Sequence, residues 1–202
     1  MIEVAVTELN RHELKFAAGV LGRSFRDNPV TIAIHGSDPL RRMRSAERVF
    51  GSFVSLLEQP PLAARRGEWI VGICGMAPPG TCQAPLLKQL RFMPAVLRDG
   101  PMAALRTLRV MNEWKKRDPK DRHWHVGPVG VEPGLQGMAV GSQMMERFSA
   151  RMDAEGELAY LETDKPENVR FYERFGFVTV DEALVLGMRN WFMRREPLSR
   201  GG

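Results

Sequence analysis

Cysteine is scarce in this chain of 202 residues, which contains only Cys74 and Cys82. Cys74 lies in an apolar run and is expected to be a buried structural thiol. Cys82 lies in a loop, and neither cysteine has partners at the spacing of a zinc site. This composition argues against a disulfide scaffold, predicts that no metal is bound, and fits a reducing cytoplasm best.

The chain also lacks a continuous apolar run. Its longest uncharged stretch, residues 69–87, approaches the roughly 20 residues of a membrane-spanning helix. Pro78-Pro79-Gly80 interrupts that stretch, so we expect a buried strand followed by a turn and no membrane partner. The N-terminal segment is acidic and alternating, unlike a secretory signal.

No stretch forms a dense run of one charge. The chain has 29 Lys and Arg against 24 Asp and Glu, a formal net charge of +5. Its short basic groups are scattered, at 41–42, 65–66, 115–117 and 194–195. The excess fits simple solubility, a polyanionic small ligand or nucleic acid, and the absence of a basic arm disfavours nucleic acid.

Hydrophobic periodicity predicts a single mixed α/β domain over residues 1–202, with a helical insertion near 83–117. Within the insertion, one apolar stripe runs through Leu86, Leu90, Met93 and Leu97, and a second through Ala104, Leu108 and Met111. Residues 30–35 are expected to be irregular. We expect helices over 10–26, 39–58, 136–155 and 166–174, and strands near 3–7, 62–66, 68–77, 123–131, 158–163, 177–181 and 184–194. Proline and glycine at 127–130 predict a bulge or a splayed end in the strand at 123–131.

The segment from Val131 to Ser142 carries the strongest chemical signal. A strand ends, a turn follows, and a helix is expected to begin with small residues at 137, 139 and 141. The first N–H groups of a helix lack intrahelical partners, so this pattern suits a phosphate or pyrophosphate. Small residues could equally permit close helix–strand packing. The segment is neither a Walker loop, since no Lys-Ser/Thr pair follows, nor a good dinucleotide fingerprint.

A second signal lies at residues 168–177. Asn168 and Tyr172 stand four residues apart and so share one face of a short helix, which ends at Gly176. The residues alone place Phe171, Phe175 and Phe177 in the core, and Tyr172 either beside them or with its hydroxyl at a site.

Together these two segments resemble the acyl-CoA signature of the GCN5-related N-acetyltransferases (GNAT). The family's Arg/Gln-x-x-Gly-x-Gly/Ala pattern reads Gln136-x-x-Ala139-x-Gly141 here. Alanine thus replaces the middle glycine and adds a methyl group beside the expected pyrophosphate. The stretches 161–163, 171–177 and 191–195, with Phe25-x-Asp27-Asn28-Pro29, resemble the puromycin N-acetyltransferase-like branch.

The resemblance implies the GNAT fold, a mostly antiparallel sheet that splays between the strands near 123–131 and 158–163 and is flanked by helices. It also implies acetyl-CoA as co-substrate, direct attack by a small-molecule primary amine, and Tyr172 as the general acid that protonates the leaving thiolate. The main chain of the strand near 123–131 would pair with pantetheine and polarise the acetyl carbonyl. The start of the helix expected over 136–155 would hold the pyrophosphate. Three residues of the helix expected over 166–174 would line the coenzyme channel. The implied cofactor-binding residues are Val129, Gly130, Val131, Gln136, Gly137, Met138, Ala139, Val140, Gly141, Ser142, Asn168, Phe171 and Tyr172.

The sequence does not identify the general base or the acceptor substrate. Candidate bases are Glu68, Glu113, His123 and His125. The two histidines share one face of their strand, and the alternative is that they are side chains at an exposed strand end. Polyamines, antibiotics, amino acids and protein N-termini are all possible acceptors. An acyl-CoA-binding protein without transfer is the alternative function, and a homodimer through the C-terminal strands is one expected assembly.

Overall fold

A computed structural model describes residues 2–198 of the protein. In this range a seven-stranded sheet has the order β1-β2-β3-β4-β5-β7-β6. Every neighbouring pair is antiparallel except β4 and β5, which are parallel. The predicted mixed, mostly antiparallel sheet is therefore confirmed. The strands are β1 (Ala5–Glu8), β2 (Leu62–Arg66), β3 (Trp69–Ala77), β4 (His123–Val131), β5 (Leu158–Thr163), β6 (Val178–Val185) and β7 (Met188–Arg195).

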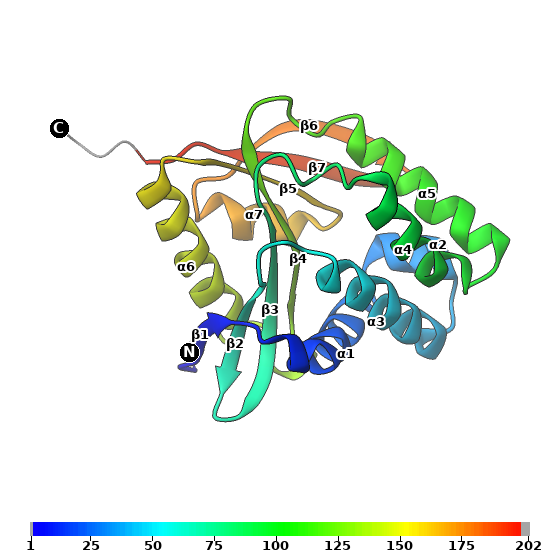
Figure 1. The fold of residues 1–202 in the computed structure, drawn as a ribbon, viewed down its shortest axis with the longest axis horizontal. Coiled ribbons are helices and arrows are strands. Elements are labelled where there is room, and N and C mark those ends of the chain that lie inside the picture. The colour runs from blue at the N-terminus through cyan, green and yellow to red at the C-terminus, as the bar shows by residue number, and fades with distance from the viewer. Residues whose placement is uncertain (1, 199–202) are drawn as a thin grey trace.

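Helices cover both faces of the sheet (Figure 1). Met144, Met145 and Phe148 of α6 pack with residues of β2–β5 in the largest apolar cluster, which also includes Tyr172 of α7. On the other face, Ala17, Val20 and Leu21 of α1 pack against Ile73. The helices are α1 (Leu14–Phe25), α2 (Pro29–His35), α3 (Pro39–Ser55), α4 (Leu86–Leu97), α5 (Pro101–Lys115), α6 (Val140–Glu155) and α7 (Pro166–Glu173), with short 3-10 turns η1 (Arg11–Glu13) and η2 (Pro133–Leu135).

β4 and β5 pair only at their N-terminal ends. The pairs are His123 with Leu158, Trp124 with Ala159 and His125 with Tyr160, after which the two strands separate. β4 meanwhile stays paired with β3 on its other edge as far as Val131. The predicted splay is therefore present, and it opens one edge of β4 over residues 126–131.

A bulge interrupts the β3–β4 pairing beside this opening. Met76 pairs with Val126 and Cys74 with Val129, so Gly127 and Pro128 together stand opposite Gly75. A Cβ atom at position 75 would collide with the carbonyl oxygen of Gly127, which explains the glycine there. The sequence-based prediction of a bulge at the proline and glycine positions is confirmed.

Residues 30–35, predicted to be irregular, form helix α2 instead. Asn28 is extended at its N-cap and Pro29 occupies the first turn, a position that suits proline. The carboxylate of Asp164, from the loop after β5, accepts a hydrogen bond from the Val30 N–H at 2.8 Å. Burial raises the pKa of Asp164. A helix of seven residues is too short to be stable alone, so its stabilising partner comes from a distant segment.

Two further boundaries differ from those predicted. Helix α6 begins at Val140 rather than 136, because η2 and a turn with Gly137 and Ala139 at positive φ precede it. The β6–β7 hairpin turns at Leu186-Gly187, both at positive φ, and not at 182–183. Positive φ at both turn residues matches the twist of a tight hairpin.

Only part of the apolar stripes predicted on α4 and α5 is buried, namely Ala104 and, partly, Met93. Phe92 and Val96 of α4 pack with Ala104 of α5 and with Val49 and Leu56. This segment is apolar on several sides, so spacing alone could not decide which side packs. Exposed residues instead include Leu86, Leu90, Leu97, Leu108 and Met111.

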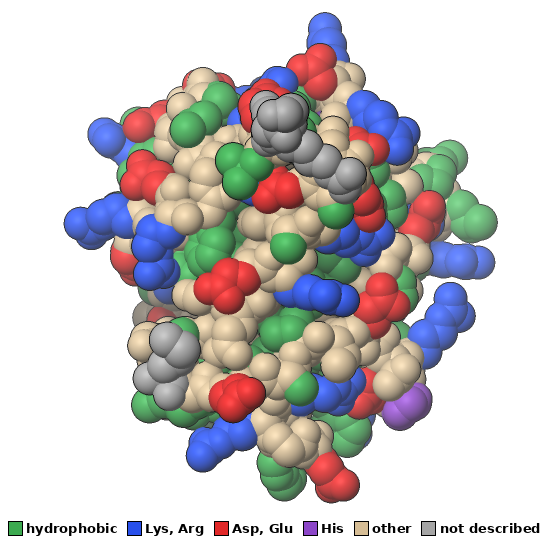
Figure 2. All heavy atoms as spheres, turned by 90° about the vertical axis from the view of Figure 1, so that its left-hand side faces the viewer, with side chains coloured by type: hydrophobic (Ala, Val, Ile, Leu, Met, Phe, Trp, Pro, Cys, Tyr) green, Lys and Arg blue, Asp and Glu red, His purple; other side chains and the backbone are tan. Residues whose placement is uncertain are grey.

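Side chains of both charges are interspersed over the face that carries α6 (Figure 2). No broad region of one charge stands out on this face. Within residues 2–198, no helix combines the length and the apolar character needed to cross a bilayer.

Candidate active site

The open edge of β4 is the first part of the site. Val129, Gly130 and Val131 lie on the part of β4 that β5 leaves unpaired. Their main chain can therefore pair with an extended, amide-containing ligand. Gly130 also faces α1, where a Cβ atom would collide with the hydroxyl of Ser24. Glycine at 130 thus lets the helix pack closely behind the open edge.

The turn between β4 and α6 is the second part. The N–H of Gln143 bonds to the carbonyl of Ala139 at 3.1 Å. The N–H groups of Val140, Gly141 and Ser142 precede this first bond of the helix and so lack intrahelical acceptors. Gln136 directs its side-chain amide to the Val131 carbonyl at 3.2 Å, and Gly137 and Met138 are exposed in the same turn. The turn offers free backbone donors at the positive end of a helix, which suits a pyrophosphate.

The backbone explains why glycine is usual at the position of Ala139. Ala139 has φ of 66° and ψ of 10°, the left-handed region that glycine adopts without strain. The sequence comparison pointed to crowding of the pyrophosphate by the alanine methyl. The structure adds a reason within the protein itself, namely that alanine makes the turn costlier to form.

Arg23 of α1 secures the same turn from the other side. Its guanidinium forms two-pronged hydrogen bonds to Glu132, with distances of 2.5–3.0 Å. This contact fixes the chain as it leaves β4. Sequence reasoning missed Arg23, because 109 residues separate it from its partner.

The two sequence signals meet where α7 packs on the start of α6. A Cβ atom at Gly141 would lie 3.3 Å from the ring of Phe171 and 3.7 Å from Val131. Phe171 contacts the rings of Tyr172 and Phe175 at centroid distances of 5.1 and 5.2 Å. Glycine at 141 therefore serves helix packing as well as access to the N–H groups.

Tyr172 lies in the same cluster with 7% of its surface exposed. Its ring contacts that of Phe177 at 5.9 Å. Burial raises the pKa of the Tyr172 phenol well above its usual range, and the proximity of Cys74 and Asp164 raises it further. The phenol therefore keeps its proton at neutral pH and can donate it in a hydrogen bond.

Asn168 is tied to the end of β5. Its side-chain amide donates to the Thr163 hydroxyl at 3.1 Å. Thr163 is buried, so the contact fixes the approach of α7 to the sheet. Asn168 thus lies at the C-terminal end of β5, next to the opening between the strands.

A cluster of polar side chains lies near the point where β4 and β5 separate. His125 Nε2 lies 2.8 Å from a Glu162 oxygen, and its Nδ1 lies 3.5 Å from Asp118. His123 Nε2 lies 3.2 Å from Asp118 and 3.5 Å from the Cys82 sulfur. The two histidines share one strand face, as predicted, but the expected exposed strand end is wrong: their side chains are only 5% and 22% exposed.

Charges within this cluster shift its protonation. Burial lowers the pKa of His123, but Asp118 and Cys82 outweigh this and raise it to about 10. Burial likewise disfavours the charged His125, yet Glu162 and Asp118 raise its pKa well above the usual value. Burial raises the pKa of the Cys82 thiol, and the histidines lower it to about 7. Both imidazoles thus hold protons at neutral pH and are not free bases in this state.

The other base candidates lie elsewhere. Glu68 is exposed in the turn between β2 and β3, at the opposite end of β3 from Ala77, the partner of His125. Glu113 of α5 is paired with Lys116 and Arg117. Cys74 is fully buried, and burial raises the pKa of its thiol to about 12, as expected of a structural cysteine.

A parallel strand pair that splays beside a helix start is a distinctive arrangement, and a comparison with solved structures identifies it. An acetyltransferase structure from Corynebacterium glutamicum, described as histone acetyltransferase HPA2 and related acetyltransferase, matches over 100% of both chains with a TM-score of 0.73 and 19% identity. The protein has the GNAT acyltransferase fold. The model of the acetyltransferase (GNAT) family matches residues 83–177, from just before α4 to the end of the α7 motif.

Two other structures with the GNAT fold extend this likeness. A GNAT family acetyltransferase from Brucella melitensis, in complex with acetyl-CoA, covers 99% of this chain and 90% of its own, with a TM-score of 0.55 and 15% identity. The polyamine N-acetyltransferase of Drosophila melanogaster covers 96% and 100%, with a TM-score of 0.59 and 14% identity. That enzyme forms N-acetylagmatine. At sequence identities of 14–19%, the likeness to these structures establishes the shared fold and nothing more.

Proposed function

We propose that the protein is a GNAT N-acetyltransferase that moves the acetyl group of acetyl-CoA to a primary amine of a small molecule. The observation that carries this proposal is the opening between β4 and β5, together with the unpaired N–H groups at the start of α6, the helix that follows β4. Neighbours that acetylate small amines support the acceptor class. The puromycin-like branch stays a prediction of the sequence.

Different backbone segments hold different parts of acetyl-CoA in this proposal. The main chain of Val129–Val131 holds the pantetheine arm, and an N–H there polarises the acetyl carbonyl. The N–H groups of Gly137 and of 139–142 hold the pyrophosphate, since those of Gln136 and Met138 already bond to the Pro133 and Leu135 carbonyls. Acetyl-CoA supplies a thioester, whose carbon bonds to the amine nitrogen while the carbon–sulfur bond breaks.

In the proposed mechanism, Tyr172 assists the leaving thiolate. Because its phenol keeps its proton, it can donate a hydrogen bond to sulfur as negative charge develops there. Asn168 and Phe171 stand beside it on α7 and line the same channel. The amine must be neutral when it attacks, so its proton leaves first.

The alternative is an acyl-CoA-binding protein without transfer. One observation favours it: both candidate histidines are paired with carboxylates, which raise their pKa and make them weaker candidates for a free base. A panel of amines decides between the two, with agmatine, spermidine, an arylalkylamine and puromycin as acceptors. Acetyl-CoA-dependent release of free thiol with at least one of them supports transfer, while coenzyme binding without turnover on any supports the alternative.

Tyr172→Phe tests the mechanism directly. Loss of the hydroxyl should lower kcat by about 100-fold or more and leave acetyl-CoA affinity near the wild-type value, because the hydroxyl acts on developing charge. Tyr160→Phe is the matched control. Tyr160 is the other tyrosine of the chain, and its hydroxyl donates a hydrogen bond to the Arg117 carbonyl. Equal turnover in Tyr172→Phe and wild type would remove Tyr172 from this role.

A further inference from the structure

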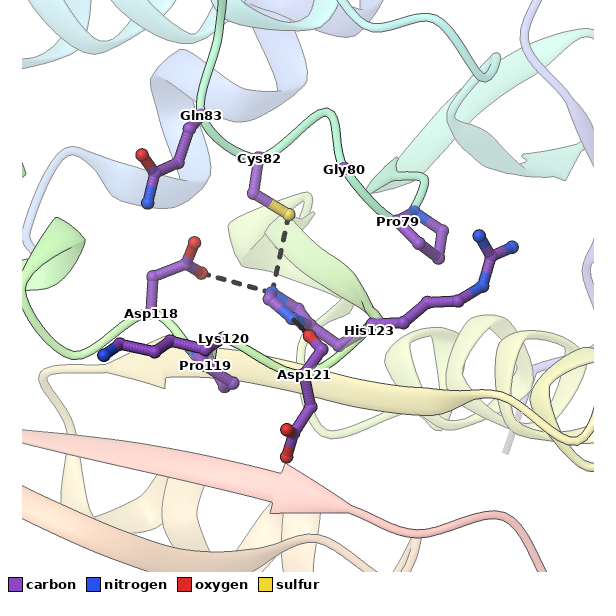
Figure 3. Close-up of a pocket in the computed structure, with 10 residues that line it drawn as sticks. Pro79, Gly80, Cys82, Gln83, Asp118, Pro119, Lys120, Asp121 and His123 are labelled. Carbon is purple, nitrogen blue, oxygen red and sulfur yellow. Dashed lines mark hydrogen bonds and ion pairs between the residues drawn. The ribbon is translucent and has the colours of Figure 1, made fainter.

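Four metal-ligating side chains converge beside the β4–β5 pair. Cys82 comes from the loop after β3, Asp118 from the loop after α5, and His123 and His125 from β4. One ligand atom from each lies within 4.8 Å of the other three. Figure 3 shows the Cys82 sulfur and the Asp118 carboxylate pointing toward the ring of His123.

We propose that these four side chains bind one Zn²⁺ ion. Zinc in proteins is usually tetrahedral, with bonds of about 2.3 Å to sulfur and about 2.0–2.2 Å to nitrogen and oxygen, so its ligand atoms lie roughly 3.3–3.6 Å apart. In the structure, Cys82 Sγ and His123 Nε2 are 3.5 Å apart. Asp118 Oδ1 lies 3.2 Å from that nitrogen and 3.5 Å from His125 Nδ1. Three of the six ligand–ligand distances thus already have nearly the lengths that the ion requires, and the other three are within 4.8 Å.

Outer contacts orient both imidazoles for this role. His123 Nδ1 lies 2.8 Å from the Asp121 carbonyl, which only accepts, so Nδ1 keeps its proton and Nε2, which faces the cluster, is the nitrogen that can lose its proton to bind metal. His125 Nε2 lies 2.8 Å from Glu162, which leaves its Nδ1 toward Asp118. A carboxylate or carbonyl behind each ligating histidine is the usual support of a zinc site.

The ligand set selects the metal and its role. A thiolate with two imidazoles favours zinc over magnesium or calcium, which take oxygen ligands. Four protein ligands close the coordination shell, which is typical of a structural site. A pocket of about 550 Å³, lined by Cys82, Asp118, His123 and neighbouring loop residues, gives the ion a route from solvent.

The position of the site defines what the ion stabilises. Cys82 precedes α4 and Asp118 follows α5, so one ion joins both ends of the helical segment to β4. The sequence alone predicted no metal, because the ligands lie 36 residues apart in two loops and two positions apart on a strand. This inference goes beyond acetyl transfer and does not depend on it.

Co²⁺ titration of the full chain, stripped of metal with a chelator, tests the site without any activity assay. The expected result is saturation at one Co²⁺ per chain, with a near-ultraviolet thiolate-to-cobalt band and the intense visible bands of four-coordinate cobalt. Equimolar Zn²⁺ should remove these bands and raise Tm. Absence of the thiolate band, or no change in Tm with zinc, would overturn the proposal.

Single-residue variants identify the ligands, and control variants show whether a lost signal comes from misfolding. Cys82→Ser should abolish the thiolate band, whereas Cys74→Ala and His12→Asn should keep it. Glu162→Gln should keep the band and weaken zinc binding by about 10–100-fold, the usual cost of losing an outer partner. Circular dichroism establishes that each variant is folded. A band that survives in folded Cys82→Ser, or disappears in Cys74→Ala, would contradict the assignment.

Discussion

Ala139 shows how one backbone torsion connects the fold to the site. Its φ of 66° allows the chain to leave η2 and present the free N–H groups of α6. For a residue with a Cβ atom, this conformation costs about 1–2 kcal/mol. Gly137, two residues earlier, has φ of 77° and carries no such cost. The turn is therefore strained at a single non-glycine residue.

Ala139→Gly should raise the free energy of unfolding by about 1 kcal/mol, because glycine removes this strain at a modest cost in unfolded-chain entropy. For a chain of this size the expected rise in Tm is about 2–4 °C. Urea unfolding and calorimetry would measure both. The matched control is Ala150→Gly, at an exposed position inside α6, which should lower stability by a similar amount. Two variants that both destabilise would show that position 139 is unstrained.

At the scale of elements, an ion pair ties η1 to the sheet. Arg65 of β2 donates to both oxygens of Glu13 at 2.7 Å. These bonds, with one from the Asn10 N–H, lower the pKa of Glu13 from 4.5 to about 2. A folded-state pKa below the unfolded one stabilises the protein above pH 4.5, and this contribution is lost as the pH falls from 4.5 to about 2.

Arg65→Met should therefore flatten the loss of stability between pH 4.5 and 2. The expected difference from wild type is on the order of 1 kcal/mol at neutral pH, because solvent screens a pair near the surface. Urea unfolding across this pH range would measure it, with the exposed Glu3→Gln as control. Parallel curves for Arg65→Met and wild type would argue against the pair.

The orientation of α4 leads to a prediction at the same scale. Phe92 is 8% exposed and packs on α3 and α5, whereas Leu90 is 58% exposed. Phe92→Ala should cost about 3 kcal/mol, while Leu90→Ala should cost less than about 0.5 kcal/mol. Chemical unfolding of the two variants compares the faces. Similar losses in both would place the helix in a different orientation.

At the scale of the whole molecule, a ligand that binds only the folded state stabilises it. Acetyl-CoA at about 100 times its Kd should raise the free energy of unfolding by about 2.7 kcal/mol, which corresponds to roughly 5–10 °C in Tm. Met138→Glu places a carboxylate beside the expected pyrophosphate and should reduce that shift by at least half.

Met102→Glu is the control for this experiment, because it adds the same charge at a methionine exposed on α5. It should keep the full shift with acetyl-CoA. Differential scanning fluorimetry measures both variants beside wild type. An equal shift in the two variants would mean that the turn before α6 does not hold the pyrophosphate.

Features that depend on neighbouring residues could be predicted from the amino-acid sequence. Strand alternation and turn residues located β4 and β5, and the spacing of Asn168 and Tyr172 placed both on α7, because periodicity and turn chemistry act within a few residues. The helix start near 140 was found within four residues. Its left-handed Ala139 was not, since alanine carries no signal for positive φ.

Features that depend on residues far apart in the chain emerged only from the folded structure. It turned Phe92 inward on α4, supplied Asp164 to the start of α2, and brought Cys82 and Asp118 to the histidines of β4. Each of these contacts joins segments that are far apart in the chain, and no local spacing records them. The open edge of β4 depends on local sequence and on tertiary packing together. The strand itself follows from its sequence, and its separation from β5 follows from the packing of the whole sheet.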